Sequence, residues 1–130
     1  EAAAFGVPAE SMECRMQRIQ YGDLLEDDQQ EARQRERFAL DQSILLMEQA
    51  SAVGATGAQA ADAIAFTTKL WALLVEDLAN PDNGLPKALR AQLVSIGIWI
   101  LRELERLRTD GAQEFTDIVA VSKAIRDGLT

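Results

Sequence analysis

The sequence has no histidine and only one cysteine, Cys14. Histidine is the commonest metal ligand and the usual general base near neutral pH, and a zinc site needs several nitrogen or sulfur ligands. A single cysteine cannot form an intramolecular disulfide bond, so we interpret Cys14 as an incidental thiol in a reducing compartment. The composition therefore disfavours histidine-dependent catalysis and a zinc site.

Long apolar runs are missing as well. A membrane-spanning helix needs about 18 or more apolar residues, and the longest candidate, residues 93–101, is interrupted by Ser95 and Gly97. The segment 1–5 lacks the basic stretch and the apolar run of a secretory signal. We therefore expect a cytoplasmic protein that does not insert into a membrane.

Basic residues are in the minority. The chain has 13 Lys and Arg against 21 Asp and Glu, a net charge of −8, and phosphate backbones repel such a chain on average. The arginines of residues 33–37 are interleaved with other residues and lie near Glu31 and Glu36, a pattern typical of a solvated helix surface. An RNA-contacting arginine patch is the alternative interpretation. We expect no direct nucleic-acid partner.

The motifs of common active sites are also absent. The sequence has no Gly-rich phosphate loop and no nucleophile elbow. The acidic residues of segment 23–28 adjoin a predicted helix start, where carboxylates cap free N–H groups. Residues 82–84 indicate a turn, because they lack the ligand spacing of a calcium loop. The sequence thus predicts a binding protein and no enzyme, without catalytic residues, cofactor or metal.

What the chain does contain is helical periodicity. Its 130 residues, of which 48% are hydrophobic, suit one folded core. Apolar residues recur at helical spacing in four segments, and we find no period-two strand pattern. The predicted helices cover residues 28–53, 58–79, 86–108 and 113–127. Because short links join them, we predict an all-α fold, a compact four-helix antiparallel bundle in residues 23–130, preceded by an irregular N-terminal arm in residues 1–22.

Glycine and proline mark the ends of the predicted helices. Gly54 suits a left-handed helix stop, and Gly128 is placed to end the fourth helix. Residues 80–86 are rich in turn formers, and Pro86 suits the first position of the third helix, where a missing N–H costs nothing. A glycine inside a helix costs about 1 kcal/mol relative to alanine. We therefore expect Gly97 to let a neighbouring helix or large side chain approach closely.

The same periodicity defines the side chains that each helix buries. Leu89 begins the apolar stripe of the third helix. The predicted core comprises Leu40, Ile44, Met47, Ile64, Trp71, Leu74, Leu78, Leu93, Ile96, Ile100, Leu104, Ile118 and Ile125.

Three helices carry a second apolar group away from the core stripe. These groups are the pairs Phe38/Leu45 and Phe66/Leu73, each seven residues apart, and the trio Val94/Ile98/Leu101. Seven-residue spacing keeps two side chains on one face, as on a surface that receives another helix. The alternative is a central helix that packs on two sides, or isolated exposed residues; for the trio, packing in the core is favoured.

Trp99 has a different setting from the other tryptophan. Its helical neighbours are mainly polar, and they include Arg102, Glu103 and Arg106. Tryptophan and arginine are enriched at the energetic centres of protein interfaces. Trp99 is therefore either part of a binding surface or packed at the edge of the core.

Several segments of the chain together form a recognisable pattern. In the second half these are residues 68–71 (TKLW), 77–86 (DLANPDNGLP), 93–99 (LVSIGIW) and 125–129 (IRDGL). In the first half they are residues 21–27 (YGDLLED), 31–33 (EAR) and 37–41 (RFALD). With these segments the chain resembles the FlaF family of flagellar regulators over about residues 19–130, and Leu-Trp followed by the Asn-Pro turn is the most specific part of the resemblance. Residues 1–18 depart from the usual family start.

The resemblance implies a cytoplasmic factor that is needed for flagellin production and export. Its partner would be flagellin protein, and it would act with or against the messenger-binding regulator FlbT. Flagellin's chain ends form long amphipathic helices that aggregate when bare, and a helical bundle with spare apolar surface could cover one. Phe66, Leu73, Trp99, Phe38 and Leu45 are the predicted partner-binding residues.

Two further classes of function stay open at this point. One is post-transcriptional control by binding of flagellin messenger RNA, which would need a local basic surface. The other is a structural homodimer, in which the spare apolar groups close on a second copy of the chain.

Overall fold

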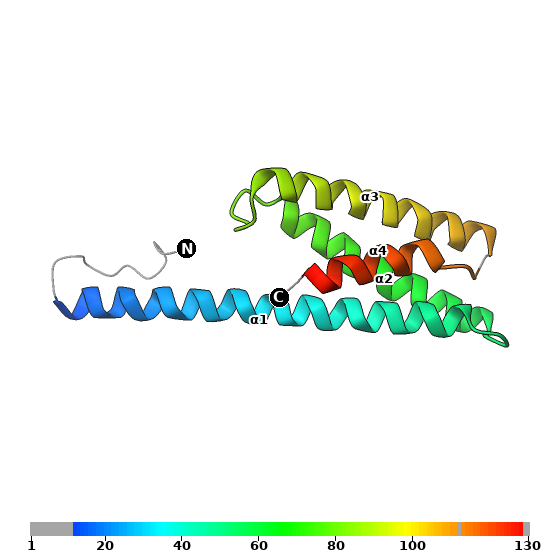
Figure 1. Cartoon of the computed structure of the whole chain (residues 1–130), viewed down its shortest axis with the longest axis horizontal. Coiled ribbons are helices and arrows are strands. Elements are labelled where there is room, and N and C mark those ends of the chain that lie inside the picture. The colour runs from blue at the N-terminus through cyan, green and yellow to red at the C-terminus, as the bar shows by residue number, and fades with distance from the viewer. Residues whose placement is uncertain (1–11, 112, 129–130) are drawn as a thin grey trace. The chain divides into compact units, whose positions relative to one another are not determined.

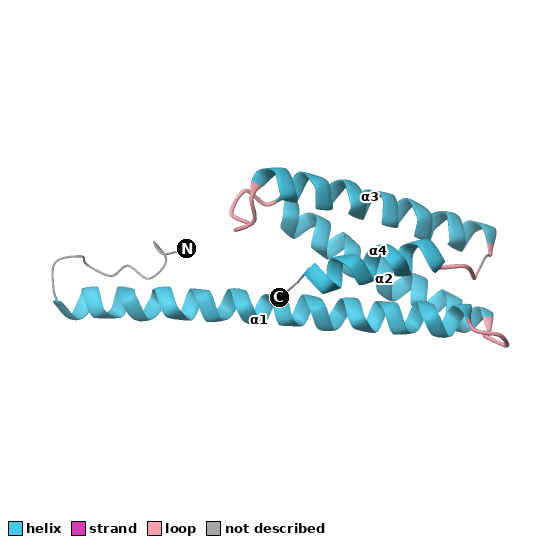
Figure 2. Cartoon of the chain, in the orientation of Figure 1, coloured by secondary structure: helices cyan, strands magenta, loops and turns pink. Residues whose placement is uncertain are grey.

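The computed structural model describes the backbone of residues 12–111 and 113–128, and the side chains of residues 30–111 and 113–128. It divides the chain into two units, residues 1–36 and 37–130. The helices are α1 (Met12–Ser51), α2 (Gly57–Ala79), α3 (Lys87–Asp110) and α4 (Thr116–Gly128) (Figure 1). Within the described residues the helices are joined by turns and loops, and there is no strand (Figure 2). The predicted all-α fold is confirmed.

The start of α1 corrects the sequence prediction. The helix begins at Met12 and not near residue 28, so residues 12–22, predicted to be irregular, are helical. Most residues between Met12 and Gln20 are good helix formers, and their summed propensity outweighs the single glycine at position 22. Cys14 therefore lies in a helix. The remainder of the predicted arm, residues 1–11, is outside the described residues, and the predicted boundary at residue 22 stays a prediction.

The link between α1 and α2 is held by a capping box that the sequence prediction missed. The hydroxyl of Thr56 accepts a hydrogen bond from the Gln59 N–H at 3.2 Å, and the Gln59 side chain accepts one from the Thr56 N–H at 2.8 Å. These bonds satisfy N–H groups that a helix start leaves free. Gly54 has a φ of 85°, the left-handed conformation predicted for a helix stop.

The turn between α2 and α3 is built by asparagine side chains. Asn80 accepts a hydrogen bond from the Asp82 N–H at 2.9 Å, and Asn83 accepts one from the Leu85 N–H at 2.9 Å. Arg90 of α3 donates hydrogen bonds to the carbonyl oxygens of Leu78, near the end of α2, and of Asn80. Side chains thus take over the bonds that the end of α2 leaves unmade.

Pro86 lies one position outside the place predicted for it. It is the residue before α3 and not the first residue of the helix. Its extended backbone, with φ −56° and ψ 143°, is the usual conformation of a cap, and its carbonyl oxygen accepts the first helical hydrogen bond from Arg90 at 2.9 Å. The prediction missed by a single residue, because both positions tolerate the loss of an N–H.

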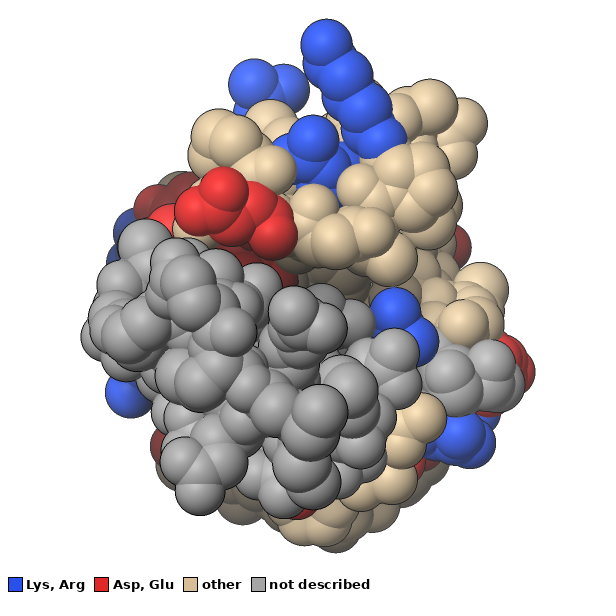
Figure 3. Space-filling view, turned by 90° about the vertical axis from the view of Figure 1, so that its left-hand side faces the viewer, with Lys and Arg blue, Asp and Glu red and all other residues tan. Residues whose placement is uncertain are grey.

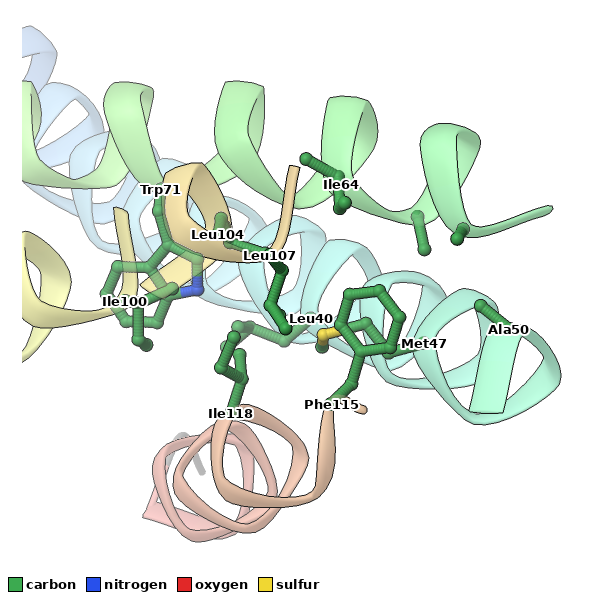
Figure 4. Close-up of a cluster of buried hydrophobic side chains, with 12 residues drawn as sticks. Leu40, Met47, Ala50, Ile64, Trp71, Ile100, Leu104, Leu107, Phe115 and Ile118 are labelled. Carbon is green, nitrogen blue, oxygen red and sulfur yellow. The ribbon is translucent and has the colours of Figure 1, made fainter. Parts of the chain in front are cut away.

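The core of the unit formed by residues 37–130 draws on all four helices. Figure 4 shows Leu40 and Met47 of α1, Trp71 of α2, and side chains of α3 and of the start of α4 pointing into a shared interior. Met47 and Phe115, which precedes α4, are fully buried. The fully buried or nearly buried members of the predicted core are Leu40, Ile44, Met47, Ile64, Trp71, Leu78, Ile100, Leu104 and Ile118.

The other residues predicted to be buried are either half-buried or exposed. Leu74, Leu93, Ile96 and Ile125 are half-buried. Leu89, placed at the start of the α3 stripe, is 40% exposed, because it lies in the first turn of α3, at the end of the bundle. Helical periodicity identifies the face on which a residue lies but does not show where along the helix the neighbouring helices end.

At Gly97, α3 packs closely against side chains of α2. An added Cβ at Gly97 would lie 2.5 Å from Cγ2 of Val75 and 3.1 Å from Cε3 of Trp71. Both neighbours are stiff or bulky side chains of α2, so neither can move away at low cost. The prediction that Gly97 admits a large side chain closely is confirmed.

We expect Gly97→Ala to lower the free energy of unfolding. Overpacking costs about 1 to 3 kcal/mol, and the better helix propensity of alanine returns about 1 kcal/mol, so a net loss of up to about 2 kcal/mol is expected. Urea denaturation of the purified protein measures it. Ser95→Ala, at an exposed position of the same helix, is the control and should change little. Stabilisation by Gly97→Ala would contradict the close approach.

Long-range polar contacts attach α4 to the rest of the unit. Lys123 pairs with Glu48 at 3.0 Å, and Arg126 pairs with Asp41 at 3.1 Å, so both ion pairs join α4 to α1. Gln113 donates hydrogen bonds to the carbonyl oxygen of Ala50, at the end of α1, and to that of Thr56, the N-cap residue of α2.

Among the helices that the structure describes, none combines the length and the apolar character that a membrane span requires.

Candidate partner-binding surface

Phe66 and Leu73 lie on the face of α2 that points away from the core. Phe66 is 38% exposed and Leu73 is 57% exposed, whereas Trp71 on the opposite face is 1% exposed. The two helical faces follow from about 100° of rotation per residue, which places residues 66 and 73 together and Trp71 about half a turn away. Of the two interpretations that the sequence left open, the structure contradicts burial of this pair against a second neighbour, and its role in partner binding stays a prediction.

Charged side chains surround this pair. Asp62 and Lys69 lie one turn from Phe66, and both Lys69 and Asp77 lie one turn from Leu73. Lys69 and Asp62 make no ion pair within the part of the chain that is described. The apolar pair thus has the arrangement of a small interface, an apolar centre with a polar rim.

The second predicted pair is exposed on α1. Phe38 is 65% exposed and Leu45 is 47% exposed, although Leu40 and Ile44 between them are buried. Of the apolar trio on α3, Ile98 is exposed, whereas Val94 and Leu101 are half-buried. The expectation that the trio belongs to the core is therefore correct only in part.

Trp99 lies at the edge of the bundle and is 38% exposed. The ring is neither buried nor fully in solvent, which agrees with packing at the edge of the core, and a role in a binding surface stays a prediction. Glu103 and Arg106, on the same side of α3, form an ion pair at 3.0 Å. The hydrogen bond from Arg106 to Glu103 raises the pKa of the guanidinium, so this arginine stays charged at any physiological pH.

One open cavity of about 250 Å³ lies between α3 and the start of α4. Its lining residues are Glu103, Arg106, Leu107, Glu114, Thr116, Asp117 and Ile118. Carboxylates near a helix start stabilise the helix through its dipole, and this explains why Glu114 and Asp117 lie at the start of α4. Among the described residues, no three of the side-chain types that bind metals are grouped to hold an ion.

A comparison with family models identifies the chain. The model described as "Flagellar protein FlaF" matches residues 17–129, which cover most of α1 and all of the following helices. The chain belongs to the FlaF family. No curated protein and no solved structure matches it.

The FlaF match confirms the resemblance found in the sequence. It includes Phe66, Leu73 and Trp99, as well as the pair on α1, so the exposed apolar residues all lie in the family region. The family description names a flagellar protein and states no reaction.

On the face of this FlaF chain drawn in Figure 3, the described Lys and Arg side chains lie among acidic and uncharged ones. On α3, Arg106 contacts the carboxylates of both Glu103 and Asp110, and Arg108 pairs with Glu105. Arginines that are already paired with carboxylates offer little to a phosphate backbone.

The structure also contains residues with roles that the sequence prediction missed. Arg90 donates a hydrogen bond to a carbonyl oxygen near the end of α2, and Gln113 donates one to a carbonyl oxygen near the end of α1. No local sequence pattern predicts either contact. Val53 is fully exposed just before Gly54 in the α1–α2 link. A local signal, Thr56 followed three residues later by Gln59, could have shown the capping box.

Proposed function

We propose that this FlaF protein binds flagellin and covers one of its amphipathic chain ends until export. The observation that carries the proposal is the exposed pair Phe66/Leu73 on the outer face of α2, a helix whose opposite face is fixed in the core by Trp71. An amphipathic helix of flagellin could lay its apolar face on this surface. Burial of apolar area would then supply most of the binding energy.

The spacing of the pair favours a helical partner. Phe66 and Leu73 are seven residues apart on α2, so two side chains at the same spacing on a flagellin helix can pack beside them. The charged rim formed by Asp62, Lys69 and Asp77 would restrict the partner's orientation. A bundle that acts in this way needs shape and charge complementarity and no catalytic group.

The packing of α2 also supports the proposal. Val75 and Trp71 of α2 lie close to Gly97 of α3, and Arg90 of α3 donates a hydrogen bond to the carbonyl oxygen of Leu78 near the end of α2. A preformed surface loses less conformational entropy on binding than a flexible one.

The pair on α1, Phe38 and Leu45, offers a second apolar surface on which FlbT or a second copy of the chain could bind.

Mixing the purified protein with purified flagellin monomer is expected to give a complex that size-exclusion chromatography with light scattering detects. The binding reaction should show a negative heat-capacity change in calorimetry, because apolar area is buried. The flagellin messenger should not shift in a gel with the protein, because the chain is acidic.

Three outcomes would count against the proposal. A messenger shift without flagellin binding would favour the RNA-binding alternative. A stable dimer that excludes flagellin would favour the homodimer. Flagellin binding without a heat-capacity change would mean that the contact is not apolar.

A further inference from the structure

The turn between α2 and α3 contains both asparagines of the sequence, Asn80 and Asn83. Asn80 is followed by Pro81, and Asn83 is followed by Gly84. The two side chains have similar local roles, because each accepts a hydrogen bond from the N–H two residues further on, at 2.9 Å in both cases. Their chemistry differs, because it depends on the backbone nitrogen of the following residue.

We propose that Asn83 is a site of spontaneous deamidation that loosens the α2–α3 turn. In the first step the backbone nitrogen of Gly84 bonds to Cγ of Asn83, the Cγ–Nδ2 bond breaks, and ammonia leaves with the proton from that nitrogen. In the second step water opens the cyclic imide. Opening at Cγ gives aspartate, and opening at the backbone carbonyl gives isoaspartate, which lengthens the main chain by one carbon.

The geometry around Asn83 favours the first step. Charge develops on Oδ1 when Cγ is attacked, and this oxygen already accepts a hydrogen bond from the Leu85 N–H at 2.9 Å. Gly84 is exposed, and its N–H makes no hydrogen bond within the described part of the chain. Glycine also has no Cβ that would hinder its nitrogen. The attacking nitrogen therefore belongs to an exposed residue and has no competing hydrogen bond among the described residues.

Asn80 provides an internal control. Pro81 has no N–H, so its nitrogen cannot lose a proton and form the imide. The two asparagines share one turn and the same kind of hydrogen bond to Oδ1, and Asn80 is the more exposed of the two. Deamidation of Asn83 alone would therefore follow from the next residue and not from exposure.

Conversion of Asn83 would remove hydrogen bonds that close the turn. Its Nδ2 donates to the carbonyl oxygen of Asp77 at 3.2 Å and to Oδ2 of Asp77 at 3.0 Å. An aspartate at position 83 has no donor there at neutral pH, and it places a second carboxylate beside Asp77, close to the negative end of the α2 dipole. The bonds from Arg90 to the end of α2 would remain.

The experiment is incubation of the folded protein in mildly alkaline buffer for days, followed by peptide mass spectrometry. We expect the mass gain of an NH-to-O exchange at Asn83 and none at Asn80. Gly84→Ala should slow the gain several-fold, because it adds a Cβ beside the nitrogen. Gly84 is not among the described glycines with positive φ, so alanine fits its backbone. The aspartate–glycine pairs at 110–111 and 127–128 can isomerise without a mass change and do not disturb this measurement.

The structural consequence is tested with Asn83→Asp, which reproduces one product. Its urea midpoint should be lower than that of the parent, and Asn83→Gln, which keeps a donor, should have a smaller effect. Two results would overturn the proposal. One is a folded protein that keeps Asn83 intact while the urea-unfolded chain converts. The other is an Asn83→Asp variant whose urea midpoint equals that of the parent.

Discussion

Replacing Trp71 by alanine is expected to lower the free energy of unfolding by about 3 to 5 kcal/mol. Trp71 is 1% exposed, and it contacts the surface of α3 at Gly97. Alanine would leave a cavity that the neighbouring helices cannot fill without moving. Domains of this size have a total stability of about 5 to 15 kcal/mol, so the variant should melt well below the parent or fail to fold.

Trp99→Ala is the matched control, since it removes the same side chain from an edge position that is 38% exposed. Its effect on stability should be clearly smaller than that of Trp71→Ala, because less apolar area returns to water. Chemical denaturation of the parent and both variants compares them. Equal effects of the two substitutions would mean that the assignment of the buried face of α2 is wrong.

The double substitution Phe66→Ala and Leu73→Ala is expected to weaken flagellin binding by about 2 kcal/mol or more, the scale of interface hot spots. Both side chains are more than one-third exposed, so their loss should change the melting temperature and the helical content little. Calorimetric titration with purified flagellin, beside a thermal melt, measures both quantities.

Leu89→Ala is a useful control for this titration, because Leu89 is an exposed leucine outside the proposed surface. It should fold and bind as the parent does. If the double variant unfolds, the pair belongs to the core. If it folds and binds normally, the flagellin surface lies elsewhere, and Phe38, Leu45 and Trp99 become the residues to test next.

The features that the sequence predicted well are local and periodic. The bounds of α2 differ from the predicted range by only one residue, and Gly54 adopts the conformation predicted for it. The sequence also showed that Phe66 and Leu73 lie away from the Trp71 stripe, although their exposure was known only from the structure, because a helix can pack on two sides. These results depend only on helix geometry and on the conformational preferences of single residues.

Other features depend on contacts that a sequence pattern does not contain. The bonds of Gln113 to the α1–α2 link and of Arg90 to the end of α2 join residues far apart in the chain. The early start of α1 depends on the propensity of a segment without a clear apolar period. Exposure of Leu89 depends on where the bundle ends. Partner binding is harder still to predict from this sequence, because it also depends on the surface of the second molecule.

The central claim is that flagellin contacts the outer face of α2, and site-specific photocrosslinking tests it directly. A benzophenone amino acid in place of Phe66 keeps an aromatic ring at that position, and the same amino acid in place of Ala120, which is exposed on α4, is the control. On irradiation with purified flagellin, the account predicts a covalent adduct from position 66 and none from position 120. Flagellin that binds both proteins but forms an adduct only at position 120, or at neither position, would contradict it.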